Sequence, residues 1–477
     1  MRRFALAGML ALFAVSHAAF AGPLGNTARE AARPTSLDTY AHAEDGAFAY
    51  KLESTVEDNG FKMYVIDLTS QKWRTEGEVS LSVWKHWMTI YVPPVVESAT
   101  ALLFIGGGDN GDPAPGKMDA NFAYVAGTAK SVVAELGMVP NQPITFPEEG
   151  KPREEDEFIT KTWDKFLRTG DPLWPARLPM TKSAVRAMDA IQLFLGSDEG
   201  GKVAVDNFVV AGGSKRGWTT WTTAAVDRRV VAITPFVIDM LNMVPSFMHH
   251  WNVYGFWAPA VGDYVEMGLM DWMGTPEYDK LLEIEEPYSY LDRFTMPKYI
   301  VNSVGDQFFL PDSSQFYWND LPGKKYLRYI PNTDHGLDGS DAYQSMTAFF
   351  HAVVTATPLP EYDWQFMADG SIRVTTNTAP IAVKLWQAAN PDARDFRKES
   401  IGEGWTSTDL TAGADGAYVG TVAKPEKGWA AYLVELTFAS AGDATFKVTS
   451  SVRIAPDTLE HTYTFPEKRP VGYLSQY

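Results

Sequence analysis

The stretch Val209-Val210-Ala211-Gly212-Gly213-Ser214-Lys215-Arg216-Gly217-Trp218 decides the fold. An apolar run from Phe208 to Ala211 predicts a buried strand, and residues 218–226 predict a helix directly after it. A strand that turns at once into a helix strains the residue at the bend and raises its side chain above the sheet, beside the free N–H groups of the helix. Ser214 at this bend can attack a carbonyl carbon while backbone donors stabilise the oxyanion.

The pentapeptide around Ser214 departs from the usual pattern for such a bend, which is Gly-x-Ser-x-Gly. Gly212 and Gly213 fit its first half, but Arg216 stands where the second glycine is expected, and Gly217 follows one residue later. Taken alone, the motif is equally consistent with a Gly-Gly turn whose serine merely caps a helix. Other parts of the chain must distinguish the two.

The composition narrows the class of protein. The chain has 477 residues, 45% of them hydrophobic, which is enough for two or three domains with substantial cores. Its net charge is −18 without a basic stripe, which argues against nucleic acids and anionic membrane surfaces as partners. The absence of cysteine excludes disulfides, thiolate metal sites and a cysteine nucleophile.

The N-terminus has the features of a secretion signal. Arg2-Arg3 precede an apolar run from Phe4 to Val15, and Ala19-Phe20-Ala21 supplies a small-residue cleavage site. The run is too short to span a membrane, and no later stretch is long and apolar enough to be a transmembrane segment. We therefore expect a signal peptide at 1–21 and a soluble mature protein in the periplasm or outside the cell.

Before Ser214 the chain alternates strand and helix patterns. Strands are predicted at 48–56, 62–73, 87–92, 102–105 and 143–146. One helix is predicted to carry Phe122, Val125, Ala126, Val133 and Leu136 on one face, and another carries Val185, Met188, Ile191 and Phe194. A charged connection is expected between them at 147–180. This order predicts an α/β sheet with helices on both faces.

The glycine run at 106–111 has two interpretations. Gly106, Gly108 and Gly111 spell the dinucleotide pattern G-x-G-x-x-G, but two prolines delay the helix and no acidic residue ends a strand at the required distance. We therefore expect no nucleotide cofactor, and no other cofactor is indicated. The favoured interpretation is a loop in which the N–H of Gly107 or Gly108 joins that of Lys215 in an oxyanion hole. A plain surface turn is the alternative.

Residues 240–292 interrupt the alternation after a predicted strand at 230–238. This stretch is rich in Met, Trp, Tyr and Phe, and it predicts a helical insertion. It is either a lid with an apolar inner face or an ordinary insertion that packs its aromatic side chains into the core. As a lid it would offer Trp251 and Trp257, together with Trp218, for substrate binding. A metal site at His249-His250 is not expected, because no third ligand has suitable spacing.

Two further residues follow predicted strands. Asp306 comes just after the strand pattern at 298–304, and His335 follows the one at 326–330. The chain order Ser…Asp…His is that of α/β-hydrolases, and the three residues are expected at one edge of the sheet. Ser214 would attack, His335 would take its proton, and Asp306 would orient the imidazole. Asp239 is the alternative acid.

The basic residues after Ser214 bear on the substrate. The ammonium group of Lys215 can face the cleft and favour an anionic acyl or sugar-acid substrate. Alternatively, Lys215 and Arg216 are both residues of the helix start that pair with nearby acids.

A second domain is predicted after Pro358-Leu359-Pro360. Short strand patterns separated by turn residues occur at 371–376, 382–387, 405–410, 417–422, 430–438 and 445–454. Their spacing and the lack of helical periodicity predict an Ig-like β-sandwich over 361–477. The preceding α/β-hydrolase domain is expected at 36–357.

The chain resembles the family of PhoPQ-activated pathogenicity-related proteins. The similarity rests on stretches 162–167, 213–221, 225–227, 305–312 and 331–335, and it extends over about 35–470. The resemblance implies an exported α/β-hydrolase-like protein linked to envelope stress and virulence-type regulation, and it implies no substrate. We therefore expect an exported serine hydrolase acting on a small-molecule or polymeric ester or amide. The alternative is a secreted binding or signalling protein on a hydrolase scaffold with little catalytic activity.

Overall fold

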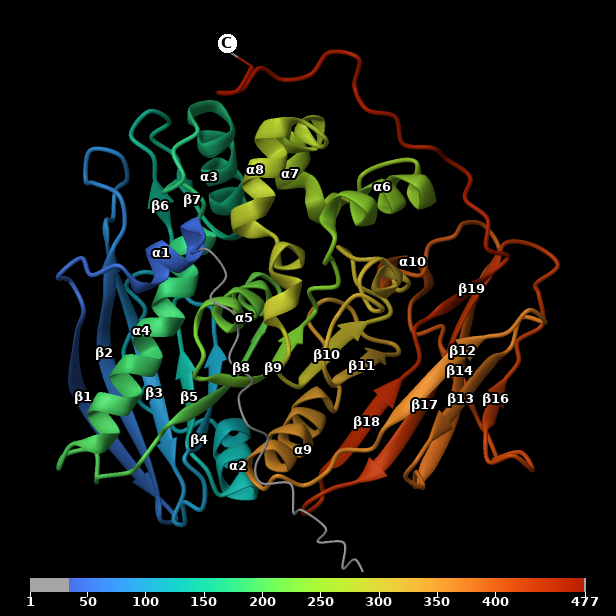
Figure 1. Cartoon of the computed structure of the whole chain (residues 1–477), viewed down its shortest axis with the longest axis horizontal. Coiled ribbons are helices and arrows are strands. Elements are labelled where there is room, and N and C mark those ends of the chain that lie inside the picture. The colour runs from blue at the N-terminus through green and yellow to red at the C-terminus, as the bar shows by residue number, and fades with distance from the viewer. Residues whose placement is uncertain (1–33, 476–477) are drawn as a thin grey trace, which may run out of the picture.

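The computed structural model describes residues 34–475 (Figure 1). The predicted signal peptide, residues 1–21, lies outside the described residues. No helix within 34–475 is long and apolar enough to cross a membrane. The centre of the molecule is a nine-stranded sheet in the order β1-β2-β3-β5-β4-β8-β9-β10-β11.

Three antiparallel strands lead into the parallel part of this sheet. They are β1 (Ala49–Asp58), β2 (Phe61–Lys72) and β3 (Val83–Val92). The parallel strands are β4 (Thr100–Ile105), β5 (Val133–Leu136), β8 (Asn207–Gly213), β9 (Val230–Phe236), β10 (Lys298–Ser303) and β11 (Lys325–Ile330). Because these six strands run in one direction, their carboxyl ends meet at one edge of the sheet.

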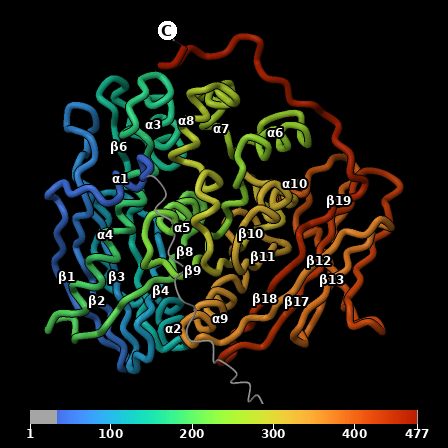
Figure 2. The backbone as a smooth tube through the Cα atoms, viewed as in Figure 1, coloured from blue at the N-terminus to red at the C-terminus, as the bar shows by residue number. Residues whose placement is uncertain are grey.

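Helices cover both faces of the sheet, as the strand–helix alternation predicts. On one face lie α1 (Ser36–His42), α4 (Arg177–Gly196) and α5 (Lys215–Val226), which contact one another and share a single apolar core. On the other face α2 (Ala120–Ala129) packs against α9 (Ala342–Val354) over a second core. Figure 2 shows α2 and α9 together, apart from α4.

Three predictions for the region before Ser214 are wrong. The helix expected to reach Leu136 ends at Ala129, because Lys130 is in the left-handed conformation and Val133–Leu136 forms β5. The strand expected at 143–146 is only β6 (Ile144–Thr145), which pairs with β7 (Pro152–Arg153) outside the large sheet. The connection expected at 147–180 contains α3 (Glu155–Thr169) and the start of α4.

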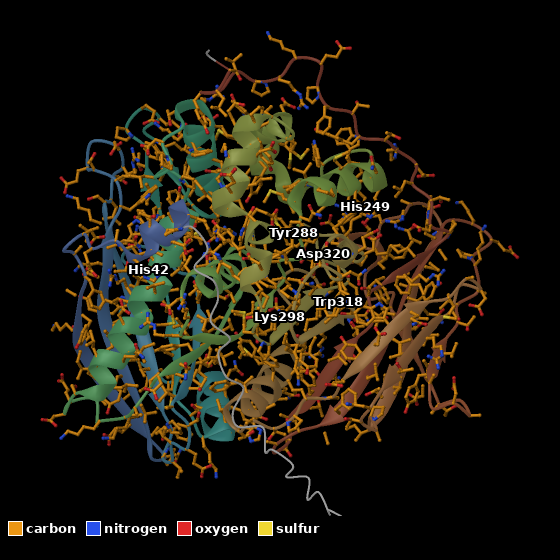
Figure 3. All side chains as sticks on the ribbon, in the orientation of Figure 1. His42, His249, Tyr288, Lys298, Trp318 and Asp320 are labelled. Carbon is orange, nitrogen blue, oxygen red and sulfur yellow. The ribbon has the colours of Figure 1, made fainter. Side chains whose placement is uncertain are left out.

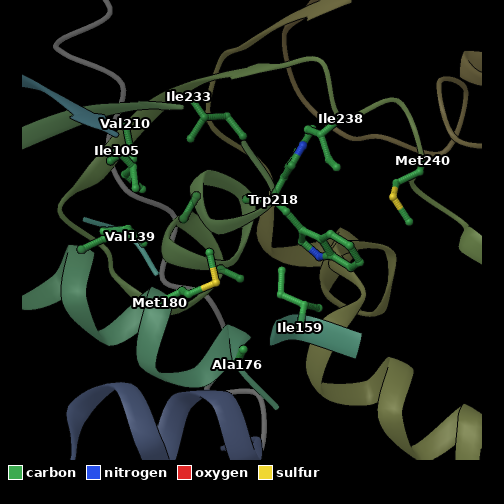
Figure 4. Packing of buried hydrophobic residues seen from close by; sticks show 14 of the residues in the cluster. Ile105, Val139, Ile159, Ala176, Met180, Val210, Trp218, Ile233, Ile238 and Met240 are labelled. Carbon is green, nitrogen blue, oxygen red and sulfur yellow. The ribbon is translucent and has the colours of Figure 1, made fainter. Parts of the chain in front are cut away.

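The insertion between β9 and β10 is helical, as predicted. Its helices are α6 (Met243–Tyr254), α7 (Gly262–Glu266) and α8 (Pro276–Glu285), with 3₁₀ turns between and after them. Its large aromatic side chains, including Trp272, Tyr278 and Tyr290, are buried in the same core as α4 and α5. The arrangement agrees with the core-packing alternative. Figure 4 shows Met240, at the start of the insertion, in this core near Trp218.

Two antiparallel sheets follow the nine-stranded sheet and its helices. One contains β12 (Tyr362–Phe366), β13 (Ile372–Thr376) and β16 (Tyr418–Gly420). The other contains β14 (Ala382–Asn390), β15 (Thr406–Asp409), β17 (Trp429–Ala439), β18 (Thr445–Thr449) and β19 (Arg453–Ala455). Val374 of the first and Val434 of the second belong to one core. Between β14 and β15 the chain forms a single turn, α10 (Lys398–Ile401).

The C-terminal residues 456–475, here called the C-terminal strap, leave this pair of sheets. The strands end at Ala455, so the sandwich predicted for 361–477 is too long. The backbone N–H of His461 donates to the carbonyl oxygen of Asn252 at 3.2 Å, and that of Tyr473 donates to the carbonyl oxygen of Leu167 at 3.3 Å. The strap, red in Figure 1, therefore runs across α6, α8 and the end of α3.

Candidate active site

Ser214 lies at a strained bend between β8 and α5. Its backbone has φ 55° and ψ −128°, and its N–H donates to the carbonyl oxygen of Phe236 at 2.9 Å. A positive φ is unfavourable for a residue with a side chain and persists only where the surrounding structure enforces it. The strand–serine–helix geometry is that of a nucleophile elbow.

The late glycine of the motif is explained by packing. A Cβ atom at Gly217 would lie 2.8 Å from the carbonyl oxygens of both Gly212 and Phe236. This is the point where helix and strands come closest, so no side chain fits there. The side chain of Arg216, one residue earlier, points away from that contact toward the loop after β4.

Both basic residues after Ser214 pair with acids at the start of α3. The Arg216 guanidinium donates to both carboxylate oxygens of Glu155, at 2.8 and 2.5 Å. Nζ of Lys215 lies 2.7 Å from Glu155 and 3.2 Å from Asp156. Burial on its own raises the pKa of Glu155, but the hydrogen bonds and charges of Arg216 and Lys215 outweigh burial and hold the pKa at about 2. The arrangement favours the acid-pairing alternative over a lysine facing the substrate.

Asp306 and His335 are in direct contact. Nδ1 of His335 lies 2.8 Å from Oδ2 of Asp306, and Oδ1 of Asp306 accepts the backbone N–H of Phe308 at 2.7 Å. The Phe308 ring packs against the imidazole with centroids 4.5 Å apart, and His335 N–H donates to Gln307 at 2.9 Å. These contacts fix the plane of the imidazole. Its other nitrogen, Nε2, is buried and has no hydrogen-bond partner among the described residues.

The alternative acid, Asp239, is engaged elsewhere. Its two carboxylate oxygens accept hydrogen bonds from the hydroxyls of Tyr317 and Tyr329. Burial, together with the charges of Asp306 and Asp312, raises the pKa of Asp239 to about 7, although these hydrogen bonds lower it. The side chain therefore accepts two tyrosine hydroxyls and makes no contact with His335.

Ser214 and His335 line one cavity of about 420 Å³. Its other walls come from the ends of β4, β8 and β9, from α2, and from the segment after His335 with the start of α9. They include Phe104, Asn121, Phe236, Val237, Leu337, Asp338, Ser340 and Tyr343. Besides Ser214, two lining residues have strained backbones, Val237 with φ 43° and Leu337 with φ 55°. Such outliers cluster where a fold shapes a functional site.

The predicted oxyanion donors differ in their surroundings, and neither Gly107 nor Gly108 is among the residues that line the Ser214 cavity. Lys215 is the first residue of α5, so its N–H is among those without an intrahelical partner. A Cβ atom at Gly107 would meet the Arg216 guanidinium at 3.0 Å, which places this glycine beside the residue that follows Lys215. Gly108 has φ 117°, a conformation that favours glycine.

The three tryptophans predicted to bind substrate do not line this cavity. Trp218 is only 3% exposed, donates its indole N–H to the carbonyl oxygen of Glu285 and lies under the guanidinium of Arg177. Trp251 and Trp257 pack against each other and against Tyr463 of the C-terminal strap. They tie the insertion to the rest of the chain, which corrects the expectation that they contact substrate.

Comparisons with known proteins define the family. The model of the PhoPQ-activated pathogenicity-related protein family matches residues 37–397. The chain belongs to this family. A Dictyostelium discoideum relative, autocrine proliferation repressor protein A, is 39% identical over 472 residues, which cover 93% of each chain.

Solved structures resemble this PhoPQ-related chain more distantly. Acetyl xylan esterase 1 from a Thermoanaerobacterium species has a TM-score of 0.45 at 15% identity, with 67% of this chain and 91% of that chain covered. An acetyl xylan esterase from a Paenibacillus species has the same TM-score at 12% identity, covering 67% and 92%. An acylaminoacyl peptidase from Pyrococcus horikoshii has a TM-score of 0.39 at 14% identity, covering 66% and 51%.

A buried charge cluster of this family member escapes simple sequence reasoning. Asp312 accepts from Arg394 at 2.7 Å and lies 3.1 Å from Nε2 of His249, the one member of the cluster that Figure 3 labels. The adjacent His250 accepts the backbone N–H of Ala258 instead. Among residues 34–475, no group of His, Asp and Glu side chains is arranged to hold a metal ion. Asp312 follows Asp306 by six residues, but nothing in the sequence links it to His249 or Arg394.

Proposed function

We propose that this protein is a serine hydrolase that cleaves an ester or amide through Ser214, His335 and Asp306. Oγ of Ser214 attacks the substrate carbonyl carbon while its proton passes to Nε2 of His335. The N–H of Lys215, with that of Gly107 or Gly108, holds the oxyanion. Collapse of the tetrahedral intermediate breaks the bond to the alcohol or amine, which takes the proton from His335. Water then hydrolyses the acyl-enzyme by the same steps and regenerates Ser214.

One observation carries the proposal. His335 is held through Nδ1 by Asp306, while its buried Nε2 has no partner within residues 34–475 and the residue lines the same cavity as the strained Ser214. A neutral imidazole with Nδ1–H bound to a carboxylate presents Nε2 as the base. No hydrogen bond joins Ser214 to His335 within residues 34–475, and catalytic hydrogen bonds of this kind often tighten only in the complex with substrate.

The cavity lining supports an uncharged substrate. Three of the residues that line the cavity are ionisable: His335, Asp338 and Tyr343. Asp338 is the carboxylate among them, and it is exposed. The ammonium group of Lys215 is already bound by Glu155 and Asp156. An anionic acyl group would therefore meet a carboxylate and no free cation, so we replace the anionic-substrate hypothesis with a neutral ester.

A fluorophosphonate probe tests this function directly. The wild-type protein is expected to become covalently labelled, and Ser214→Ala is expected to abolish labelling. Ser340→Ala is the matched control, because it removes another hydroxyl from the same cavity and should leave labelling intact. Labelling that persists in Ser214→Ala would show that another residue reacts and would refute the assignment.

Export is part of the proposal and rests on the N-terminal sequence. The charged start, the apolar run to Val15 and the cleavage site at Ala21 support removal of residues 1–21 and action in the periplasm or outside the cell. The N-terminal residue of the mature protein isolated from the producing cells tests it: a start at Gly22 is expected, and retention of Met1 or Arg2 would contradict it.

The second candidate function is that of a secreted signalling or binding protein whose triad is not used. It is favoured by the 39% identity, over nearly the whole chain, to a protein named as an autocrine proliferation repressor. Purified wild type and Ser214→Ala should then slow the growth of the producing cells equally. A growth effect confined to wild type supports hydrolysis.

A further inference from the structure

A second, larger cavity lies between the hydrolase-like part and the C-terminal sheets. Its volume is about 580 Å³, and it shares no lining residue with the Ser214 cavity. One wall is the segment from Asp312 to Asn319 after β10, and the other comes from β12, the first half of β17 and β19. This size and this place between two structural units are typical of small-molecule sites.

Aromatic side chains form much of its surface. Trp318 from the first wall and Trp364 from the second lie with ring centroids 5.0 Å apart at 36°, and both are partly exposed. Phe366 is 46% exposed and Tyr432 completes the wall. Figure 3 labels Trp318 on the side of the molecule facing the C-terminal strands. Partly exposed rings that line a cavity offer flat apolar faces to a ligand.

Arg394, which lines the same cavity, has hydrogen-bond donors without an acceptor among the described residues. Its side chain is 2% exposed, and Nη2 donates to Asp312 at 2.7 Å. Nε and Nη1 are buried and have no acceptor among the described residues. Buried donors are nearly always satisfied in folded proteins, so these N–H groups point to a bound acceptor. The exposed residues Gln315 and Asn319 also line the cavity and carry amide groups, although Nε2 of Gln315 already donates to the carbonyl oxygen of Asp312 at 2.9 Å.

The charges around the cavity favour an uncharged ligand. Arg394 and Arg453 are balanced by Asp312 and Asp457, all four of which line it. A cationic ligand would compete for the aromatic rings with cations of the protein itself, because Lys325 lies 5.0 Å from the centroid of Trp318 and Arg453 lies 5.3 Å from that of Phe366. An anion would be repelled by Asp312 beside the free donors of Arg394.

We propose that this cavity binds a neutral oligosaccharide. Sugar rings combine apolar C–H faces, which pack on aromatic rings, with uncharged hydroxyl oxygens, which accept the free N–H groups of Arg394. The hydroxyls at the edge of the ring are also suitable partners for Gln315 and Asn319. This binding site does not depend on the proposed hydrolysis at Ser214.

The experiment is titration of the full-length mature protein with soluble saccharides. The neutral probes are cellohexaose, xylohexaose, maltohexaose and chitohexaose, and hexagalacturonate is the anionic probe. We expect saturable binding of at least one neutral probe by calorimetry, together with a change in tryptophan fluorescence. Trp364→Ala should weaken that binding about three- to tenfold, as expected for loss of a ring-stacking contact.

Two exposed variants avoid a folding artefact. Phe366→Ala and Asn319→Ala remove side chains that line the cavity, and they should weaken binding without changing the unfolding midpoint. The control is Ile381→Ala, which is 63% exposed in the same unit and should leave binding unchanged. The proposal is overturned if no neutral probe binds at millimolar concentration. It is also overturned if binding survives Trp364→Ala and Phe366→Ala unchanged, or if hexagalacturonate binds more tightly than every neutral probe.

Discussion

Arg216 and Glu155 form a two-pronged ion pair, in which the two terminal nitrogens of the guanidinium donate to separate carboxylate oxygens at 2.8 and 2.5 Å. The pair joins the bend at Ser214 to the start of α3. Glu155 is held from behind by Gln142, which accepts its backbone N–H at 2.9 Å and donates to its carboxylate at 2.8 Å. Glu155 itself has a positive φ of 48°. The position of the candidate nucleophile therefore depends on a carboxylate 59 residues before it (214 − 155).

Glu155→Gln should destabilise the protein. The variant keeps the size of the side chain but leaves Arg216 and Lys215 without their shared counter-charge. We expect the free energy of unfolding to fall by about 1–3 kcal/mol, measured by urea denaturation. Glu154→Gln is the control, because that side chain is exposed, and it should change stability by less than about 0.5 kcal/mol. Equal effects of the two variants would contradict the structural role of the pair.

The contribution of Glu155 should depend on pH in a defined direction. Its pKa in the folded protein, about 2, lies below its ordinary value of 4.5. The stabilisation is therefore fully present above the ordinary value and is lost as the pH falls toward 2. The difference in unfolding free energy between wild type and Glu155→Gln should be constant above about pH 5 and shrink below it. A difference that grows in acid would refute this assignment.

Removing the charge of Asp306 should slow labelling of Ser214 by the probe, whereas removing that of Asp239 should have little effect. Asp306→Asn reverses the favoured imidazole tautomer, so we expect the rate of probe labelling at Ser214 to fall by about 10³-fold or more. Asp239 has no hydrogen bond to His335 within residues 34–475, so Asp239→Asn should change that rate by less than about threefold. If Asp239→Asn abolishes labelling while Asp306→Asn does not, the acid comes from the end of β9.

Lys215→Met should not alter the preference between anionic and neutral esters of equal size. The backbone donor remains, and the ammonium group that is lost already faces two carboxylates, so kcat/KM should fall equally for both substrates. Asp338 lies in the cavity wall, and Asp338→Asn should raise kcat/KM for the anionic ester about two- to fivefold relative to the neutral one. The effect is small because solvent weakens the action of an exposed charge. A selective loss of the anionic ester in Lys215→Met would restore the earlier substrate hypothesis.

Tyr463→Ala should loosen the helical insertion. Its ring packs on Trp251 and Trp257 with centroids 6.1 and 5.9 Å away, and its N–H donates to the side chain of Asn252. We expect the free energy of unfolding to fall by about 1–3 kcal/mol and amide hydrogen exchange in α6 to become faster. Leu459→Ala, at an exposed position of the strap, should leave both quantities unchanged. Unchanged exchange in Tyr463→Ala would show that the strap does not hold the insertion.

The residues around Ser214, Asp306 and His335 could be located from sequence because each follows a short apolar run. In a parallel sheet, the ends of such runs meet at one edge, so local patterns suffice to bring distant residues together. The order Ser…Asp…His adds a constraint that single motifs lack. This reasoning needed no knowledge of side-chain contacts, and it located the strand ends within a few residues.

Sequence reasoning failed where a pattern had two structural meanings. Val133 and Leu136 continue the apolar spacing of α2, yet the left-handed Lys130 ends the helix and turns them into β5. Trp218, Trp251 and Trp257 have the composition of a binding surface, but their environment depends on segments that pack against them from elsewhere in the chain. The role of Glu155 was equally hidden, because its partners are separated from it by about sixty residues.

The C-terminal strap also joins two segments that are synthesised at very different times. Asn252 receives a backbone N–H from Tyr463, a residue 211 positions later, and Glu277 receives one from Leu474. Synthesis runs from the N-terminus, so the insertion is made long before the segment that covers it. A chain terminated early would present Trp251 and Trp257 without Tyr463, and exposed apolar surface of this kind is what chaperones and proteases recognise. The packing of the insertion therefore depends on a strap residue, Tyr463, that is synthesised long after it.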